Sequence, residues 1–152
     1  MSPAERYDPP GAAERAFSRV FGWLVSLGFG PRDYFLLEVR GRTSGQLRAT
    51  PVDLLEHDGR RFLVAGRGRT HWVRNAEAAG QIVLRKGRTR LRFRARAVAD
   101  AEKPGILKAY LDRFKSTVQR FFPVPAGSPT SAFVDVAERY PVFELSPADA
   151  DR

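Results

Sequence analysis

Apolar and polar residues alternate in short runs along the middle and the end of the chain, and turn-forming residues separate these runs. A period of two residues is typical of a β-strand that buries one face. The runs predict strands at residues 34–39, 47–56, 61–65, 81–85, 89–98 and 141–145. His57-Asp58-Gly59-Arg60 is typical of a hairpin turn. Pro51 predicts that the second strand lies at a sheet edge or a bulge, because proline donates no ladder hydrogen bond.

Three segments carry apolar residues at helical spacing. They span 12–30, which ends at a Gly-Phe-Gly-Pro cluster, 71–79, which precedes Gly80, and about 100–122. The long third helix has one apolar stripe, which we expect to be core: Leu107, Tyr110, Leu111, Phe114, Val118, Phe121 and Phe122. Residues 131–138 predict a short helix or an extended segment. About six consecutive, mostly antiparallel strands with attached helices indicate a small β-barrel of the α+β or mainly β class.

The length of 152 residues predicts one domain at 12–152, preceded by a loose arm at 1–11. Within it we expect a helix at 12–30 and a barrel at 34–145. The chain has no cysteine, which fits a cytoplasmic protein, and its longest uncharged run, Val20–Gly30, is shorter than the roughly 20 residues of a membrane span. The first helix is expected to pack on the core. A peripheral membrane contact stays open, because Trp23 lies among its apolar residues.

The formal net charge of +9 indicates attraction to an anionic partner, but charge alone does not choose among nucleic acid, lipid and a phosphorylated ligand. In the strand at 89–98, four arginines alternate with apolar residues: Arg90, Arg92, Arg94 and Arg96. Period two places all four on one face. We favour a solvated sheet face, and a track for an anionic ligand remains the alternative.

Candidate chemistry concentrates in two loops. The chain has no cysteine, no Gly-x-Ser-x-Gly turn and no metal-ligand spacing of histidines and carboxylates, which argues against the usual hydrolases. The turn Gly41–Arg48 combines glycines, hydroxyls and two arginines, which together suit an anion. The loop at 65–70 follows, and then His71, which is either a ligand contact or a helix-start residue.

Gly-Arg-x-Ser-Gly-x-x-Arg-x-x-Pro at 41–51, followed by Trp-x-x-Asn at 72–75, resembles the signature of the deazaflavin-dependent nitroreductase and F420H2-dependent quinone reductase family of split β-barrel proteins. The resemblance covers roughly 35–145. It implies coenzyme F420 as cofactor, with a phospholactyl oligoglutamate tail, and hydride transfer to a small-molecule acceptor such as a quinone or a nitroaromatic compound. By position, the resemblance implies these coenzyme contacts: Arg42, Thr43, Ser44, Gly45, Gln46, Leu47, Arg48, Pro51, Val52, Ala65, Gly66, Arg67, Trp72 and Asn75.

Under this resemblance no catalytic side chain is required, since the cofactor carries the reaction; His71 is a candidate proton donor. Three alternatives stay open: an FMN-binding split-barrel reductase, a basic barrel that binds nucleic acid, and a protein that binds the coenzyme without turnover. We expect no nucleic-acid partner, because the aromatic residues fall at core spacing and do not alternate with the arginines on one face. The chain is expected to be a monomer or a homodimer.

Overall fold

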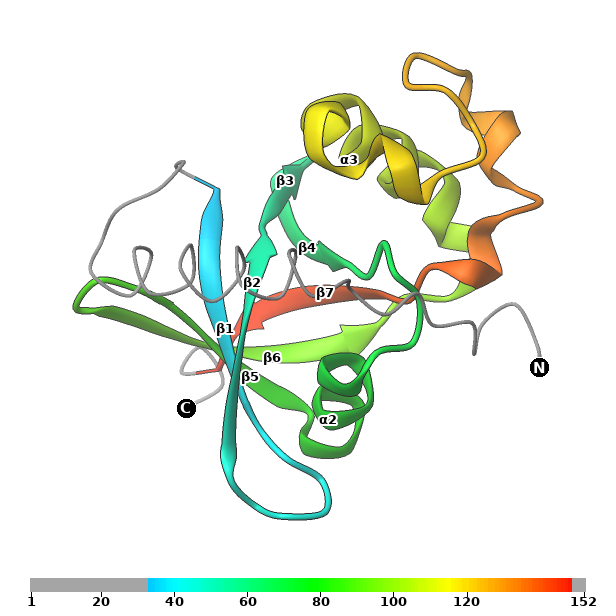
Figure 1. The fold of residues 1–152 in the computed structure, drawn as a ribbon. Coiled ribbons are helices and arrows are strands. Elements are labelled where there is room, and N and C mark those ends of the chain that lie inside the picture. The colour runs from blue at the N-terminus through cyan, green and yellow to red at the C-terminus, as the bar shows by residue number, and fades with distance from the viewer. Residues whose placement is uncertain (1–32, 149–152) are drawn as a thin grey trace.

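A single curled sheet organises the fold (Figure 1). The computed structural model describes residues 33–148, so the predictions for the arm at 1–11 and the helix at 12–30 lie outside the described residues. All strand pairings in this part of the chain are antiparallel, in the order β2-β1-β5-β6-β7-β4-β3. The strands are β1 (Tyr34–Arg40), β2 (Leu47–Asp53), β3 (Leu55–His57), β4 (Arg60–Val64), β5 (Gln81–Lys86), β6 (Thr89–Ala97) and β7 (Val142–Pro147).

The predicted strand at 47–56 is in fact two strands, β2 and β3, which lie at opposite edges of the sheet. Leu54 and Leu55 are both buried, at 5% and 1% exposure, which breaks the two-residue alternation that one half-buried strand requires. The Leu54 N–H donates to the carbonyl oxygen of Asp33 at 2.7 Å. The chain therefore crosses from one edge of the sheet to the other at this point, and the sheet curls. The edge position of β2 confirms the inference from Pro51.

The hairpin predicted at His57–Arg60 is confirmed. Asp58 and Gly59 have φ values of 53° and 73° between β3 and β4. Two consecutive residues with positive φ are characteristic of the two-residue turns whose twist matches that of paired strands. The register of the hairpin places Leu55 opposite Phe62, so both side chains enter the same core.

Helices cover two separate parts of the sheet. The helix α2 (His71–Ala79) ends at Gly80, as predicted, and buries Val73 and Ala76 against the sheet. The predicted helix at 100–122 consists of η2 (Asp100–Glu102), α3 (Lys103–Val118) and η3 (Gln119–Phe121), with non-helical backbone angles at Phe114. The segment 131–138 forms short turns, η4 (Thr130–Phe133) and η5 (Ala137–Arg139).

Two apolar cores result. One lies between α2 and the sheet and contains Leu37, Leu84 and Phe93. The other joins α3 and the short turns to β3 and β4, around Phe62, Leu107 and Phe133. Five residues of the predicted apolar stripe are buried in this second core, and Phe114 and Phe121 pack against it half-buried, which confirms the stripe as core. None of the helices formed by residues 33–148 is both long enough and apolar enough to cross a membrane.

Candidate functional site

The turn between β1 and β2 is a braced loop. The Gly41 N–H donates to the carbonyl of Gln46 at 2.7 Å, and the Gly45 N–H donates to the carbonyl of Gly41 at 2.9 Å. Gly45 has φ 72°, a conformation that favours glycine over residues with a Cβ. Ser44 Oγ accepts from the Gln46 N–H at 3.2 Å, and a Cβ added at Gly41 would come within 2.8 Å of that oxygen. The turn residues therefore fix the shape of this loop.

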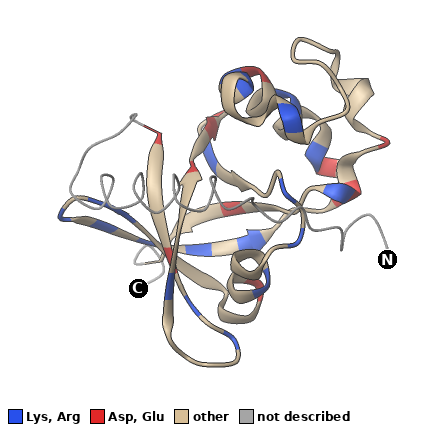
Figure 2. Ribbon diagram, viewed as in Figure 1, with Lys and Arg blue, Asp and Glu red and all other residues tan. Residues whose placement is uncertain are grey.

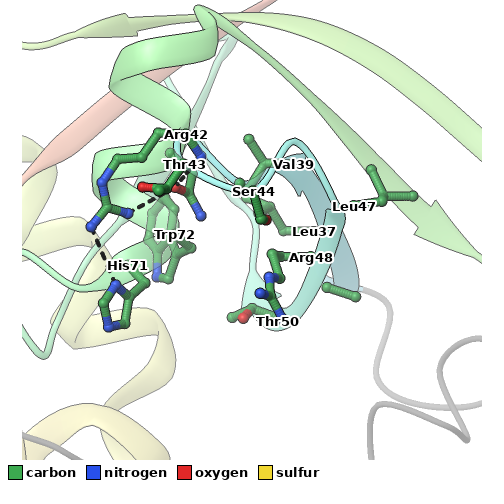
Figure 3. A pocket seen from close by; sticks show the side chains of 13 residues that line it. Leu37, Val39, Arg42, Thr43, Ser44, Leu47, Arg48, Thr50, His71 and Trp72 are labelled. Carbon is green, nitrogen blue, oxygen red and sulfur yellow. Dashed lines mark hydrogen bonds between the residues drawn. The ribbon is translucent and has the colours of Figure 1, made fainter.

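A hollow of about 700 Å³ lies between this turn, the adjoining ends of β1 and β2, and the start of α2 (Figure 3). We call it the turn hollow. It has a polar side, from the turn and its arginines, and an apolar side, from β1 and the Trp72 ring. Its lining consists of Leu37, Val39, Gly41, Arg42, Thr43, Ser44, Leu47, Arg48, Ala49, Thr50, His71, Trp72 and Asn75.

Asn75 holds Arg42 in this hollow. Its Oδ1 accepts from the Arg42 backbone N–H at 3.0 Å and from Arg42 Nη1 at 2.8 Å, across 33 residues of sequence. Asn75 is only 4% exposed, so its position is fixed by packing. Because an amide is neutral, it orients the guanidinium group without compensating its charge. Arg42 is itself exposed, and it can therefore still attract an anion.

His71 and Trp72 begin α2 at the same side of the hollow. Arg42 Nη2 lies 3.4 Å from His71 Nδ1, and since a guanidinium group can only donate, Nδ1 is the acceptor in this long contact. The residue before the helix, Thr70, provides no side-chain cap, and its buried Oγ1 has no hydrogen-bond partner in the structure. The first turn of α2 contains no acidic residue. The start of α2 therefore has neither a side-chain cap from Thr70 nor an acidic residue in its first turn.

The structure gathers some of the predicted contacts and not others. Eight predicted residues line the turn hollow, seven of them expected coenzyme contacts and the eighth the candidate proton donor: Arg42, Thr43, Ser44, Leu47, Arg48, His71, Trp72 and Asn75. Gly45 and Gln46 belong to the same turn but not to the lining. Pro51 and Val52 lie further along β2, half-buried.

The predicted contacts in the second loop, residues 65–67 of the loop at 65–70, pack toward the end of the long helix. Ala65 is buried. A Cβ on Gly66 would lie 3.3 Å from the Phe121 ring, and Arg67 Cζ lies 4.6 Å from the centre of that ring. None of these three residues lines the turn hollow. Their contacts pack the loop that follows β4 against Phe121 of η3.

Five lining residues were not among the predicted contacts: Leu37, Val39, Gly41, Ala49 and Thr50. Strand alternation gives a signal for part of this set, because Leu37 and Val39 share a face and pair with Thr50 and Arg48 on β2. The pairing register itself was not predictable from either strand alone. The residues on the apolar side of the hollow could therefore be identified only from the structure.

A second group of ionisable residues lies at the other end of the β1–β2 pair, where Tyr34 is opposite Asp53. Burial, with a smaller contribution from the Asp33 carboxylate, raises the pKa of Asp53 to about 6. Burial raises the pKa of Tyr34 to about 12, with a smaller contribution from Asp53. Residues 33–148 contain no group of three or more metal-binding side chains. Asp53 is thus an acid that changes protonation near neutral pH, remote from the turn hollow along β2.

The family model of the F420H(2)-dependent quinone reductases matches residues 16–120. No curated protein matches the sequence significantly.

Several solved structures share the fold at low sequence identity. An F420-H2 dependent reductase, FDR-A, is 20% identical with a TM-score of 0.51, over 76% of this chain and 95% of the other. A domain-swapped dimer is 20% identical with a TM-score of 0.52, over 88% and 96%. A protein provisionally assigned as a pyridoxamine 5'-phosphate oxidase, from Listeria innocua, is 10% identical with a TM-score of 0.51, over 77% and 85%.

At these identities the likenesses show the split-barrel fold alone, which confirms the predicted fold class. The family model establishes the family of this chain, because it matches more than half of the chain. The chain therefore belongs to the F420H2-dependent quinone reductase family, and it is an oxidoreductase whose cofactor is coenzyme F420.

Proposed function

We propose that the turn hollow binds the phosphate-bearing part of coenzyme F420 and that the enzyme reduces a quinone or a nitroaromatic acceptor. One observation carries this proposal: Arg42 is held in a hollow by a neutral amide, so its charge is oriented and uncompensated. Arg48 lines the same hollow and has no ion pair with any residue in 33–148. Two available guanidinium groups beside an apolar wall suit a ligand with an anionic end and a flat apolar end.

The residues present fit this cofactor. The hollow is within the usual size range of small-molecule sites, roughly 300–1,000 Å³. Its polar side offers charge-assisted and hydroxyl donors, and the start of α2 adds N–H groups with no acidic residue beside them. A helix start of this kind favours an anion. The orphaned Thr70 hydroxyl shows that polar groups at this helix start lack partners in the protein itself.

In this proposal, different residues of the chain bind the phosphate, shape the turn and contact the rest of the coenzyme. Arg42, Arg48, Thr43 and Ser44 would bind the phosphate, with Gly45, Gln46 and Leu47 shaping the turn around it. The side chains of Leu37, Val39 and Trp72 would exclude water from the deazaflavin ring of the coenzyme. We propose that Pro51 and Val52 contact the deazaflavin ring. Ala65, Gly66 and Arg67 would contact the coenzyme from the second loop.

When bound in its reduced form, coenzyme F420 supplies a hydride to the acceptor. Reduction of a quinone to a quinol also consumes a proton. His71 is exposed at the edge of the hollow, and its ring is the candidate donor of this proton.

The test is a fluorescence titration of the purified chain with coenzyme F420, with FMN as the parallel ligand. We expect micromolar or tighter binding of F420 and no binding of FMN. Binding of FMN alone would overturn the proposal in favour of a flavin reductase, and binding of neither would show that the hollow is not a cofactor site.

The acceptor class is tested in the same preparation. Reduced F420 is mixed with a soluble quinone and, separately, with a nitroaromatic compound, and the return of the oxidised chromophore is followed by absorbance. We expect turnover with at least one of them. Binding without any turnover would contradict the proposed acceptors and favour a storage or delivery role.

A further inference from the structure

A cluster of ionisable side chains joins the start of β1, the end of β2 and the helix α3. Asp33 directly precedes β1, and its carboxylate forms an ion pair with the guanidinium group of Arg113 on α3. Asp53 ends β2, opposite Tyr34. The carbonyl oxygen of Asp33 accepts from the Leu54 N–H at 2.7 Å, so the backbone holds the two acidic residues close together. This cluster lies outside the turn hollow.

The helix α3 supplies a second side chain, Tyr110, to this cluster. Tyr110 is only 5% exposed, and burial, with a smaller contribution from Asp53, raises its pKa well above the usual range. Among residues 33–148, Asp53 has no ion-pair partner, and Arg113 is paired with Asp33. Asp53 is therefore the member of the cluster whose negative charge the described residues do not compensate.

Ionisation of Asp53 is unfavourable in this position. Its pKa is about 6, against 3.8 for an ordinary aspartate, because of burial first and of the Asp33 carboxylate second. A carboxylate in such a place would be stabilised by water, which the closed packing keeps away. A local opening that hydrates Asp53 therefore becomes more favourable once Asp53 has lost its proton.

The backbone of α3 is irregular beside the cluster. Phe114, the residue after Arg113, has φ −112° and ψ 24°, which lies outside the helical range. The chain then continues into η3, where Phe121 packs against the loop that follows β4. A Cβ on Gly66 of that loop would lie 3.3 Å from the Phe121 ring. The segment between Arg113 and Phe121 thus connects the cluster with the loop after β4.

We propose that Asp33, Asp53 and Arg113 form a pH-sensitive switch between α3 and the adjoining ends of β1 and β2. With Asp53 protonated, Arg113 compensates the charge of Asp33, and α3 stays packed on the cluster. When Asp53 loses its proton, the two carboxylates repel each other and compete for Arg113. The part of α3 around Phe114 then opens to water more often. The switch needs no cofactor, so it is independent of the proposed function of the turn hollow.

Hydrogen exchange of the full chain between pH 5 and pH 8 tests the switch, with rates corrected for the intrinsic pH dependence of amide exchange. With a pKa of 3.8 for hydrated Asp53 and about 6 for packed Asp53, linkage makes the opening about tenfold more frequent at pH 8 than at pH 5. We expect this increase for the amides of residues 110–117. The amides of α2, which packs on the other core, are the internal control and should change less than about twofold. Equal corrected rates for residues 110–117 at the two pH values would overturn the switch.

Variants assign the effect to the two carboxylates. Asp53→Asn keeps the shape of the side chain without its charge, so we expect equal corrected rates at pH 5 and pH 8. Asp135→Asn, at an exposed position between η4 and η5, is the matched control and should keep the full difference. A pH effect that persists in Asp53→Asn would contradict the role of this carboxylate.

The ionisation of Asp53 can also be followed directly, through NMR of its carboxyl carbon. Asp33→Asn removes the neighbouring charge, and we expect the midpoint of Asp53 to fall below that of the wild type. The wild-type titration itself requires no variant to fold. A wild-type midpoint at the ordinary value of 3.8 would overturn the switch.

Discussion

The arginines of the turn and those on the outer face of the sheet are held in opposite ways. On the outer face, Glu144 accepts from Arg60 at 2.7 and 2.8 Å and from Arg96 at 2.6 Å. Glu38, only 5% exposed, lies 2.6 Å from Arg90 and 3.4 Å from Arg85. At the turn, Arg42 is held by the uncharged Asn75. These four outer-face arginines form one set, which is paired with carboxylates, and the arginines of the turn form the other set, which is not.

Figure 2 shows the same contrast along the chain, with basic residues on β5 and β6 and acidic positions on the neighbouring strands β1 and β7. The net charge of +9 counts both sets equally. What matters for a ligand is which guanidinium groups lack a carboxylate partner. Of the four alternating arginines of β6, Arg90 and Arg96 are already paired within the sheet, which supports the solvated-face interpretation for them.

The most direct test of this comparison uses two double variants, each of which removes two arginine charges from one set. We expect Arg42→Ala with Arg48→Ala to weaken coenzyme binding by more than tenfold, and by about a hundredfold if each loses one charge-assisted contact. The thermal midpoint should stay near that of the wild type. Arg90→Ala with Arg96→Ala is the matched double variant, for which we expect nearly unchanged affinity and a lower thermal midpoint. Fluorescence titration and thermal unfolding measure both quantities, and similar binding losses in the two doubles would remove the distinction.

A single substitution can give Arg42 a carboxylate partner, like those of the arginines on the outer face. Asn75→Asp keeps the shape of the side chain and the acceptor oxygen for Arg42, but it adds the carboxylate that the turn lacks. We expect coenzyme affinity to fall about tenfold, with the fold retained because the new charge is paired. Titration of the variant provides the measurement. Unchanged affinity would mean that the uncompensated charge of Arg42 is not what the ligand binds.

The reverse experiment removes the carboxylate from the outer face. Glu144→Gln leaves Arg60 and Arg96 without their shared partner, and Glu144 is 22% exposed in its side chain. We expect the free energy of unfolding to decrease by about 1–2 kcal/mol, after allowance for solvent screening. Urea unfolding measures this change. Coenzyme affinity should remain within about twofold of the wild type, and a parallel loss of binding would show that the two regions are coupled.

The smallest effect is the dependence of that loss on pH. Hydrogen bonds from Arg60 and Arg96 lower the pKa of Glu144 from 4.5 to about 2. A lowered carboxyl pKa contributes stability that is complete above about pH 4.5 and disappears as the pH falls toward 2. The difference in unfolding free energy between wild type and Glu144→Gln should therefore shrink over this interval. A difference that stays constant from pH 6 to pH 3 would contradict the role given to these ion pairs.

The order and the type of most elements could be predicted from sequence, because alternation and turn residues agree along β1, β4, β5 and β6. The break at Leu54 could not, since it depends on which edge of the sheet each half of the segment joins. For the candidate site, the signature turn identified the arginines. Asn75 was expected to contact the coenzyme, whereas the structure shows it bound to Arg42, 33 residues away in sequence. No local pattern reports such a contact, and the coenzyme contacts themselves stay predictions.

The bond between Asn75 and the turn also bears on how this site could be moved or inherited. A graft of the turn alone onto another barrel would carry the arginines but not the amide that fixes Arg42 in two places. The smallest portable unit is the turn together with the helix position that supports it. In related sequences we therefore expect the arginine and the asparagine to be kept or lost together, and a chain with only one of them should be a poor candidate for the same ligand.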